Sequence, residues 1–430
     1  MECDIIIVGA GLAGLSAANE IASRSRGSIV VVERRFAGSN NPTPMTFADV
    51  PGRFGLEDCT IGAYNRFTFH SPLGNKSTHD FEEFRLVALA YQRACLSLLN
   101  RASTAGNVWV YAGSARSLAR RGAKWLVSLN DGRQLKAPLV IDASGRGLFT
   151  SRALGLASPR SYSHCYGARF SNCQIPDPQE AFFFAPCDDF GNGGGWLYPL
   201  KQAAGQPSGE KQMADNGMQV SFGYATLSQS AVLPGAAVKQ KFKRALAEFS
   251  PYASWMKGAV LDHLEVGTIP IYPLRSFVYD GLLIVGDAAG QATIWSCLGS
   301  EAALEAGRLA GDAASIALKR GEFSRRTLGQ YQKHWDQRYR RVYQHNAWIA
   351  PTIWSMSETD WNRQIPRVQA LTSEQMLARL RINWPVPTLP QAAFVRAYDL
   401  AGRARRAVVS QLRSLWATRT DSFSPPASND

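Results

Sequence analysis

DIIIVGAGLAG, residues 4–14, decides the fold of this chain. An apolar run suited to a buried strand ends at Gly9, where the chain makes a tight turn into a helix. Gly11 lets a pyrophosphate approach the backbone, and Gly14 lets the helix pack closely on the strand. A second strand ends at Glu33, about 20 residues on, where a carboxylate can accept hydrogen bonds from a ribose diol. The unit therefore predicts a Rossmann-type dinucleotide site.

The composition is that of an ordinary globular protein. The chain has 430 residues, 45% of them hydrophobic and 19% charged, which suffices for two or three domains with sizeable cores. Its net charge of +13 is spread along the chain, and no nucleic-acid-binding motif accompanies it. We therefore expect a solvated basic surface and no nucleic-acid partner.

Cysteine usage and the N-terminus bear on the compartment. The seven cysteines are odd in number and form no CxxC pair, which argues against a disulfide framework and a structural zinc site. No His, Cys or Asp spacing matches a ligand set, so we expect no bound metal. The first strand begins within about four residues of the N-terminus, which leaves no room for a signal peptide. No segment has the roughly 18 apolar residues of a spanning helix. These features predict a cytoplasmic protein.

Hydrophobic patterns divide the rest of the chain. They predict helices over 84–102 and 299–318, a strand over 108–115, and a hairpin around Asn130-Asp131-Gly132. From residue 156 to 271, antiparallel strands replace this pattern. We predict a discontinuous dinucleotide-binding domain of residues 1–155 and 272–325, with an inserted sheet domain of residues 156–271. A helical region of residues 326–420 and a disordered tail of residues 421–430 follow.

Three separated segments resemble the flavin monooxygenase superfamily typified by p-hydroxybenzoate hydroxylase. They are the glycine-rich unit with Glu33, the run Ile141-Asp142-Ala143-Ser144-Gly145-Arg146, and Gly286-Asp287-Ala288-Ala289-Gly290. They more closely resemble its geranylgeranyl reductase and lycopene cyclase-like branch, and the match covers roughly residues 1–320 in order. The resemblance implies an α/β fold: a Rossmann-type, GR2-like FAD-binding domain, an inserted antiparallel β-sheet substrate domain and a helical C-terminal region.

The resemblance also implies FAD as the tightly bound cofactor, and the single GxGxxG supports one permanent dinucleotide site. NAD(P)H is then expected as a transient reductant. By the resemblance, Ala115 lies by the adenine and Asp287 meets the ribityl chain or pyrophosphate. Members of the family have an arginine at the position that Tyr91 occupies in this chain. Arg93 is the candidate to take the role of that arginine. The cofactor-binding candidates are Gly9, Gly11, Ala13, Gly14, Glu33, Arg34, Arg93, Ala115, Asp287 and Gly299.

A fourth mark concerns the substrate. Gly195-Trp196-Leu197-Tyr198-Pro199 resembles the Trp-x-Phe-Pro strand that lines the substrate cavity in the reductase branch. An ordinary aromatic strand explains the same residues, and both interpretations stay open. Trp196, Tyr198 and Trp295 are the substrate-binding candidates.

The loop before the helix at 299 departs from the family pattern. Ile294 stands where the family has Pro, and Cys297 where it has the first Gly of a Gly-x-Gly. Cys297 is either a redox or covalent residue or a small packing residue, and we favour packing. Glu301 could supply acid chemistry or favour the helix start, and His70 could contact substrate or pack in the core. These three are the catalytic candidates; Asp188 and Asp189 share the ambiguity.

The residues and the resemblance together predict an FAD-dependent oxidoreductase. Monooxygenation of a hydrophobic aromatic or isoprenoid small molecule comes first, because it is the commoner reaction across the superfamily. Reduction of a double bond, as in geranylgeranyl reductases, is the alternative favoured by Gly290 and the Trp196 strand. A redox-neutral cyclase and a catalytically degenerate flavin-binding partner protein also stay open.

The C-terminal region offers a further partner surface. A basic amphipathic stretch over 394–415 could cap the FAD domain, form a dimer contact or touch a membrane, and capping is the preferred interpretation. We expect a monomer or homodimer whose main partner is a hydrophobic small molecule.

Overall fold

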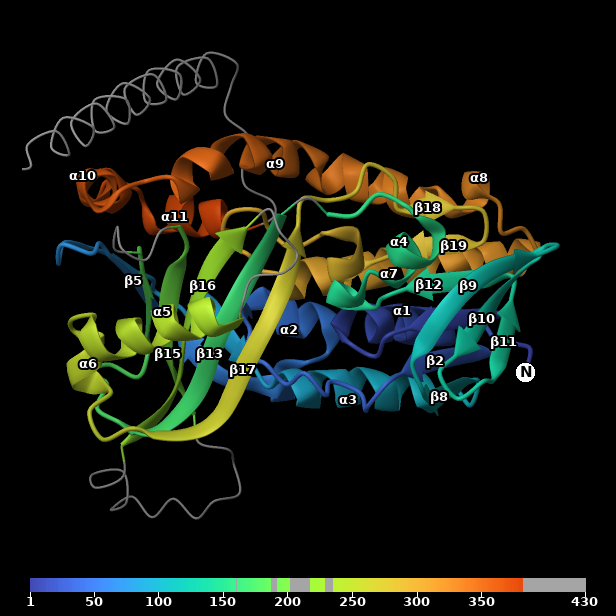
Figure 1. The fold of residues 1–430 in the computed structure, drawn as a ribbon, viewed down its shortest axis with the longest axis horizontal. Coiled ribbons are helices and arrows are strands. Elements are labelled where there is room, and N and C mark those ends of the chain that lie inside the picture. The colour runs from blue at the N-terminus through green and yellow to red at the C-terminus, as the bar shows by residue number, and fades with distance from the viewer. Residues whose placement is uncertain (160, 187–191, 202–216, 229–234, 382–430) are drawn as a thin grey trace, which may run out of the picture. The chain divides into compact units, whose positions relative to one another are not determined.

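A parallel sheet forms the centre of the computed structural model, which describes residues 1–159, 161–186, 192–201, 217–228 and 235–381 (Figure 1). Its strand order is β18-β19-β12-β1-β2-β8, with only the edge strand β18 antiparallel to its neighbour. The strands are β1 Ile5–Val8, β2 Ile29–Glu33, β8 Val108–Ala112, β12 Leu139–Asp142, β18 Val278–Tyr279 and β19 Leu282–Ile284. Continuous apolar runs such as Ile5-Ile6-Ile7-Val8 form these strands because both faces of the sheet are covered.

Different elements cover the two faces. On one face, Ile5, Ile7 and Val31 pack with helices α1 (Leu12–Arg24), α3 (Tyr91–Ser103) and α7 (Ser300–Arg320). On the other, Ile6 and Val30 pack against a three-stranded sheet of β9 (Ala115–Arg121), β10 (Lys124–Leu129) and β11 (Gln134–Ala137). The hairpin predicted around residues 130–132 is the β10–β11 turn.

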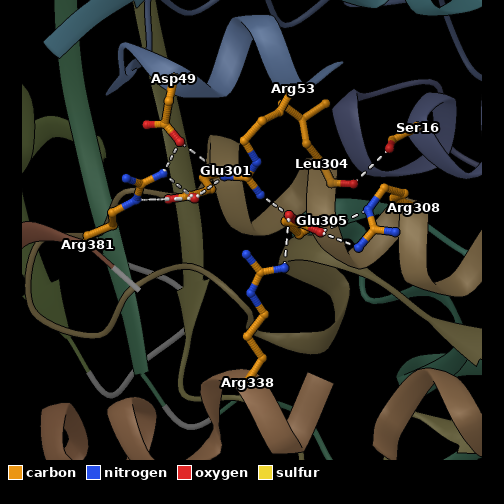
Figure 2. Close-up of polar contacts among 9 residues, drawn as sticks. All are labelled: Ser16, Asp49, Arg53, Glu301, Leu304, Glu305, Arg308, Arg338 and Arg381. Atoms are coloured by element: carbon orange, nitrogen blue, oxygen red, sulfur yellow. Dashed lines mark hydrogen bonds and ion pairs between the residues drawn. The ribbon is translucent and has the colours of Figure 1, made fainter. Parts of the chain in front are cut away.

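Helices α1 and α7 approach closely because small residues meet between them. A Cβ on Gly307 would lie 2.2 Å from the Ala13 carbonyl oxygen, so only glycine fits there. Ser16 Oγ donates a hydrogen bond to the Leu304 carbonyl at 2.7 Å (Figure 2). This contact fixes the start of α7 against the glycine-rich loop.

A seven-stranded sheet, ordered β17-β13-β16-β15-β14-β5-β6, is antiparallel except where β14 meets β5. Its strands are β5 Arg66–His70, β6 Lys76–Asp80, β13 Ser161–Cys173, β14 Glu180–Phe184, β15 Gly194–Leu200, β16 Met218–Ser228 and β17 Val260–Ile271. Helices α5 (Gly235–Glu248) and α6 (Tyr252–Trp255) pack on one face through an aromatic cluster. Strands β5 and β6 come from the segment before residue 156, so this sheet is not built from 156–271 alone.

The remaining described elements surround these sheets. A small sheet, ordered β3-β7-β4, consists of β3 Met45–Phe47, β7 Leu86–Leu89 and β4 Thr60–Tyr64. The other helices are α2 Asp49–Phe54, α4 Phe149–Leu154, α8 Arg325–Leu328, α9 Gln330–Trp354, α10 Glu358–Gln369 and α11 Ser373–Leu380. The predicted α/β fold with an antiparallel sheet and a helical C-terminal region is confirmed. No described helix has the length and apolar character needed to span a bilayer.

Two predicted elements are wrong in part. The helix predicted over 84–102 begins only at Tyr91, because Leu86–Leu89 forms the central strand of the small sheet. The strand predicted over 108–115 ends at Ala112, and after a turn Ala115 opens β9. In both cases strand partners distant in sequence decide the local structure. The amphipathic stretch 394–415 and the tail 421–430 lie outside the described residues, as do Asp188 and Asp189.

Candidate functional site

A cavity of about 1030 Å³ lies where the carboxyl ends of the parallel strands, the seven-stranded sheet and helices α10 and α11 meet. In parallel α/β sheets, ligands bind at this carboxyl edge. The lining runs from Gly9 and Glu33 at the parallel sheet to Trp196 and Glu265 on the other sheet, and to Trp361 on α10. One cavity therefore joins the glycine-rich loop to the sheet that was predicted to bind substrate.

The glycine-rich loop is held in one conformation. Gly9 has a φ of 111°, and a Cβ there would lie 2.3 Å from the Ala143 carbonyl oxygen. A Cβ on Gly14 would lie 2.1 Å from the Gly9 oxygen. Glu33 Oε2 accepts a hydrogen bond of 2.9 Å from the Ala10 backbone N–H. The turn is thus fixed by the parallel strands on either side of it.

The residues here fit a dinucleotide. Helix α1 has Gly11 as its N-cap, with no side-chain hydrogen bond to the cap and no acidic residue in the first turn. The first N–H groups of a helix have no partner within the helix, and its dipole is positive at this end. Because Gly11 and Leu12 line the cavity, these donors face a space suited to a pyrophosphate. Glu33, on the same wall, offers a carboxylate for a ribose diol. The donor set suits FAD.

Asp287 lies in a short 3-10 turn, Gly286–Ala289, at the cavity wall. The turn is fixed by Gln291, whose Oε1 accepts a 2.7 Å hydrogen bond from Gly286 N and whose Nε2 donates to Tyr331 Oη. Burial raises the pKa of Asp287 to about 6. A bound group that donates hydroxyl hydrogen bonds to this carboxylate would stabilise its charged form.

FAD affinity is expected to fall as the pH drops through about 6. Hydroxyl donors of the cofactor lower the pKa of Asp287 in the complex, so FAD binding releases a proton near this pH. Affinity is therefore full above about pH 6 and weakens below it. Titrating the protein with FAD over a pH range centred on this value measures the effect. The Asp287→Asn variant is the control, and a pH dependence that survives in it would assign the effect to another group.

The other cofactor-binding candidates divide by position. Tyr91 lies at the loop, since a Cβ on Gly11 would be 2.8 Å from its hydroxyl oxygen. Gly14 packs beneath the loop and is not on the lining. Arg93 is also outside the lining, and its Nη1 donates to the Asp58 carbonyl oxygen at 2.9 Å. The candidates on the cavity wall are Gly9, Gly11, Ala13, Glu33, Arg34, Ala115, Asp287 and Gly299.

The central motif at 141–146 supports the loop from the neighbouring strand. Asp142 is fully buried and accepts hydrogen bonds from Ser144 N and from both Thr150 N and Oγ1. These bonds hold the turn that carries Ala143 against Gly9. Asp142 therefore braces the backbone, while Arg146 reaches the lining.

The loop that departs from the family pattern lies on the cavity wall. Cys297 has a φ of 57°, the left-handed region that glycine adopts freely, and its backbone N–H donates to the Thr293 carbonyl at 3.0 Å. Its thiol lies beside Ser163 and Cys165 of β13. Burial raises the pKa of Cys297 to about 12 and that of Cys165 to about 11. Both thiols stay protonated near neutral pH, which suits packing better than nucleophilic chemistry.

One face of the seven-stranded sheet lines the cavity, and we call this face, which carries Trp196, Tyr198 and Glu265, the floor. Trp196 lies in register with Gly223 of β16, which in turn pairs with Gly167 of β13. A Cβ on Gly223 would lie 2.2 Å from the Trp196 ring, and one on Gly167 would lie 3.0 Å from it. The two glycines thus let the indole lie across the strands. Trp196 and Tyr198 both line the cavity.

The rest of the apolar wall comes from distant segments. Phe69 of β5 and Trp361 of α10 lie with ring centroids 5.2 Å apart, and both line the cavity with Phe183. Trp295, in the loop before α7, lines the cavity and donates a 2.9 Å hydrogen bond to the Arg379 carbonyl. Sequence reasoning missed Phe69 and Trp361, because neither stands in a motif.

Two catalytic candidates lie off the cavity lining. His70 Nδ1 is 2.6 Å from Tyr252 Oη of α6, on the far face of the sheet, and burial lowers its pKa to about 4. Glu301 lies between Arg53 and Arg381, at 2.7 and 2.8 Å from their guanidinium groups (Figure 2). Neither side chain is placed to exchange a proton with a ligand in the cavity.

Glu301 belongs to a cluster that we call the α7 ion-pair network. Its members are Asp49, Arg53, Glu301, Glu305, Arg308, Arg338 and Arg381 (Figure 2). Arg53 of α2 bridges the two buried carboxylates, Glu301 and Glu305. The network joins α2, α9 and the end of α11 to the first turns of α7, directly after the cavity wall.

Comparison with known proteins agrees with this geometry. The family model described as lycopene cyclase protein matches residues 4–172. Digeranylgeranylglycerophospholipid reductase 2 of Methanopyrus kandleri is 26% identical over 88% of this chain and 92% of its own. A geranylgeranyl bacteriochlorophyll reductase-like structure from Thermoplasma acidophilum has a TM-score of 0.73 at 19% identity, covering 86% of this chain and 92% of that one. A probable FAD-dependent monooxygenase from Pseudomonas aeruginosa has a TM-score of 0.62 at 14% identity, covering 84% and 99%.

These comparisons confirm the predicted resemblance and the predicted fold. The class of proteins that the chain resembles in sequence and in fold is that of the FAD-dependent oxidoreductases. Within it, the chain resembles the geranylgeranyl reductase and lycopene cyclase-like branch.

Proposed function

We propose that this protein binds FAD and reduces a carbon–carbon double bond of a hydrophobic, isoprenoid-type substrate. The observation that carries the proposal is the single cavity that joins the glycine-rich loop to the apolar floor of the sheet. The curated reductase of Methanopyrus kandleri resembles the chain along most of both lengths, which favours reduction over the monooxygenation that sequence reasoning placed first. NAD(P)H is the proposed source of electrons, and it would bind transiently.

The protein's own residues bind and orient the ligands in this proposal. The first N–H groups of α1 and Arg146, which line the cavity, would hold the pyrophosphate, Glu33 the adenosine ribose, and Asp287 the ribityl hydroxyls. When bound and reduced, FAD would supply a hydride to one carbon of the double bond, and a proton from solvent would complete the reduction at the other carbon. Trp196 and Phe183 offer an apolar surface on which an unsaturated chain can lie flat. Cys297 and Trp295 extend this wall of the cavity.

An anaerobic turnover experiment tests the proposed reaction. The FAD-loaded protein is reduced with NADPH under nitrogen and mixed with geranylgeraniol, while the flavin absorbance is followed. We expect reoxidation of the flavin that depends on geranylgeraniol, and a product that has gained two hydrogen atoms by mass spectrometry. An oxidoreductase function would be contradicted if the protein takes up no FAD. It would also be contradicted if the reduced protein converts neither the alkene nor, with oxygen present, an aromatic substrate.

Monooxygenation is the second candidate, and the aromatic wall of Phe69, Trp196 and Trp361 favours it because such rings also stack on an aromatic substrate. The same experiment, repeated with oxygen present, separates the two reactions. Reoxidation that requires oxygen, with a product that gains one oxygen atom, would assign monooxygenation and overturn the reductase proposal.

A further inference from the structure

One carboxyl group of the substrate cavity has no part in the cofactor site. Glu265 of β17 is only 7% exposed and lines the cavity. It pairs across the sheet with Gly167, which pairs with Gly223 and then Trp196. Because side chains on one face recur across paired strands, Glu265 lies on the same floor as the Trp196 indole.

Neighbouring hydroxyl groups fix this carboxyl. Thr43 Oγ1 donates a hydrogen bond to Glu265 Oε1, and Ser221 Oγ lies 3.5 Å from Oε2. Ser221 in turn accepts a 3.2 Å hydrogen bond from Trp196 Nε1. Arg169 Nε lies 3.3 Å from Oε1, but Arg169 is not on the cavity lining. The carboxyl group of Glu265 is therefore held in one orientation, and Ser221 connects it by hydrogen bonds to the Trp196 indole of the floor.

The position of Glu265 sets a distance along the cavity. Cys165 lies beside Cys297 of the loop that adjoins Asp287 and Gly299, and it pairs with Gly267, two residues further along β17 than Glu265. A strand rises about 3.3 Å per residue, so Glu265 lies roughly 7 Å along the strand from the contact with that loop. The carboxyl thus marks the end of the floor away from the loop.

We propose that Glu265 binds a hydroxyl group of the substrate at this end of the cavity. A hydroxyl both donates and accepts hydrogen bonds, so it suits the carboxyl whether or not that group is ionised. A diphosphate would bring a second anion against the acid, and a hydrocarbon would bring no partner at all. The substrate is then a long-chain or ring alcohol whose hydroxyl lies at the end of the cavity away from the loop. This rests on the proposed apolar substrate, and not on which reaction follows.

Binding titrations of the FAD-loaded protein test the proposal without turnover. The probes are farnesol, farnesene and farnesyl diphosphate, with 2-naphthol and naphthalene as an aromatic pair, followed by tryptophan fluorescence and flavin absorbance. We expect each alcohol to bind about tenfold more tightly than its hydrocarbon, as one hydrogen bond to a charged or acidic group predicts. Farnesyl diphosphate is expected to bind more weakly than farnesol.

Three variants assign the preference to Glu265. Glu265→Leu is expected to lose the tenfold preference while still binding the hydrocarbons, and Glu265→Gln, which can donate and accept, should keep most of it. Thr43→Val, which frees the carboxyl from its donor, should reduce the preference with no change at Glu265 itself. An unchanged preference in Glu265→Leu, or tightest binding of the diphosphate, would overturn the proposal. A protein that binds the naphthol pair as expected but turns over no alkene would overturn the reductase function alone.

Discussion

A Gly14→Ala variant is expected to purify with little or no FAD. The added Cβ would lie 2.1 Å from the Gly9 carbonyl oxygen and 3.0 Å from Ala143 Cβ, and both belong to the turns that form the site. Helix α1 must then move away from the strand, which displaces the N–H groups that face the cofactor. Overpacking of this kind costs about 1–3 kcal/mol, and a cost of that size in the bound state lowers FAD affinity roughly 5- to 150-fold. Titration of the protein with FAD, followed by flavin fluorescence, measures it.

The matched control for this variant is Gly235→Ala at the start of α5. A Cβ at Gly235 meets no atom within 4 Å, so the added methyl group should leave FAD affinity unchanged and should not lower thermal stability. Circular dichroism of both variants separates loss of cofactor from loss of fold. A Gly14→Ala protein that retains FAD at the wild-type level would show that α1 does not hold the dinucleotide.

The parts of the fold that follow local rules could be predicted from the sequence. The turn at Gly9, the helix after it and the strand ending at Glu33 depend on residues close together in the chain, and all three are present. Leu86–Leu89 could not be assigned in this way. Its apolar spacing also suits a helix, and only pairing with β3 and β4 makes it a strand.

In the site, too, features set by neighbouring residues in the sequence could be predicted, and features set by distant residues could not. Trp196 and Tyr198 stand out in the sequence as an aromatic strand, and they line the cavity. Glu265 stands in a strand of alternating polar and apolar residues, and only the register with Gly167 places it on the cavity floor. Glu301 is an acidic residue in the first turn of α7, which is all that the sequence indicates. Its partner Arg53 lies 248 residues away, so the ion pair could not be predicted.

The α7 ion-pair network connects this helix to the cavity wall. The carbonyl groups of Arg379 and Leu380 accept hydrogen bonds from Trp295 Nε1 and Ser296 Oγ, and the next residue, Arg381, pairs with Glu301. Three consecutive residues at the end of α11 therefore bind the loop and the helix that follows it. Because the loop lines the cavity, the network contributes to the shape of the site without touching a ligand.

An Arg53→Met variant is expected to lose about 2 kcal/mol of folding stability. Arg53 contacts both Glu301 and Glu305, whose side chains are only 8% and 3% exposed, and methionine keeps the length of the side chain without its charge. Two buried carboxylates are then left with weaker compensation, although Arg381, Arg308 and Arg338 remain as partners. Chemical denaturation followed by circular dichroism measures the loss.

A matched surface variant identifies the cause of this loss. Arg340→Met is the control, because Arg340 is 65% exposed and its 3.7 Å contact with Asp336 is a surface ion pair worth less than about 1 kcal/mol. A loss in Arg53→Met that equals the control would mean that apolar packing and not charge compensation holds α2 against α7.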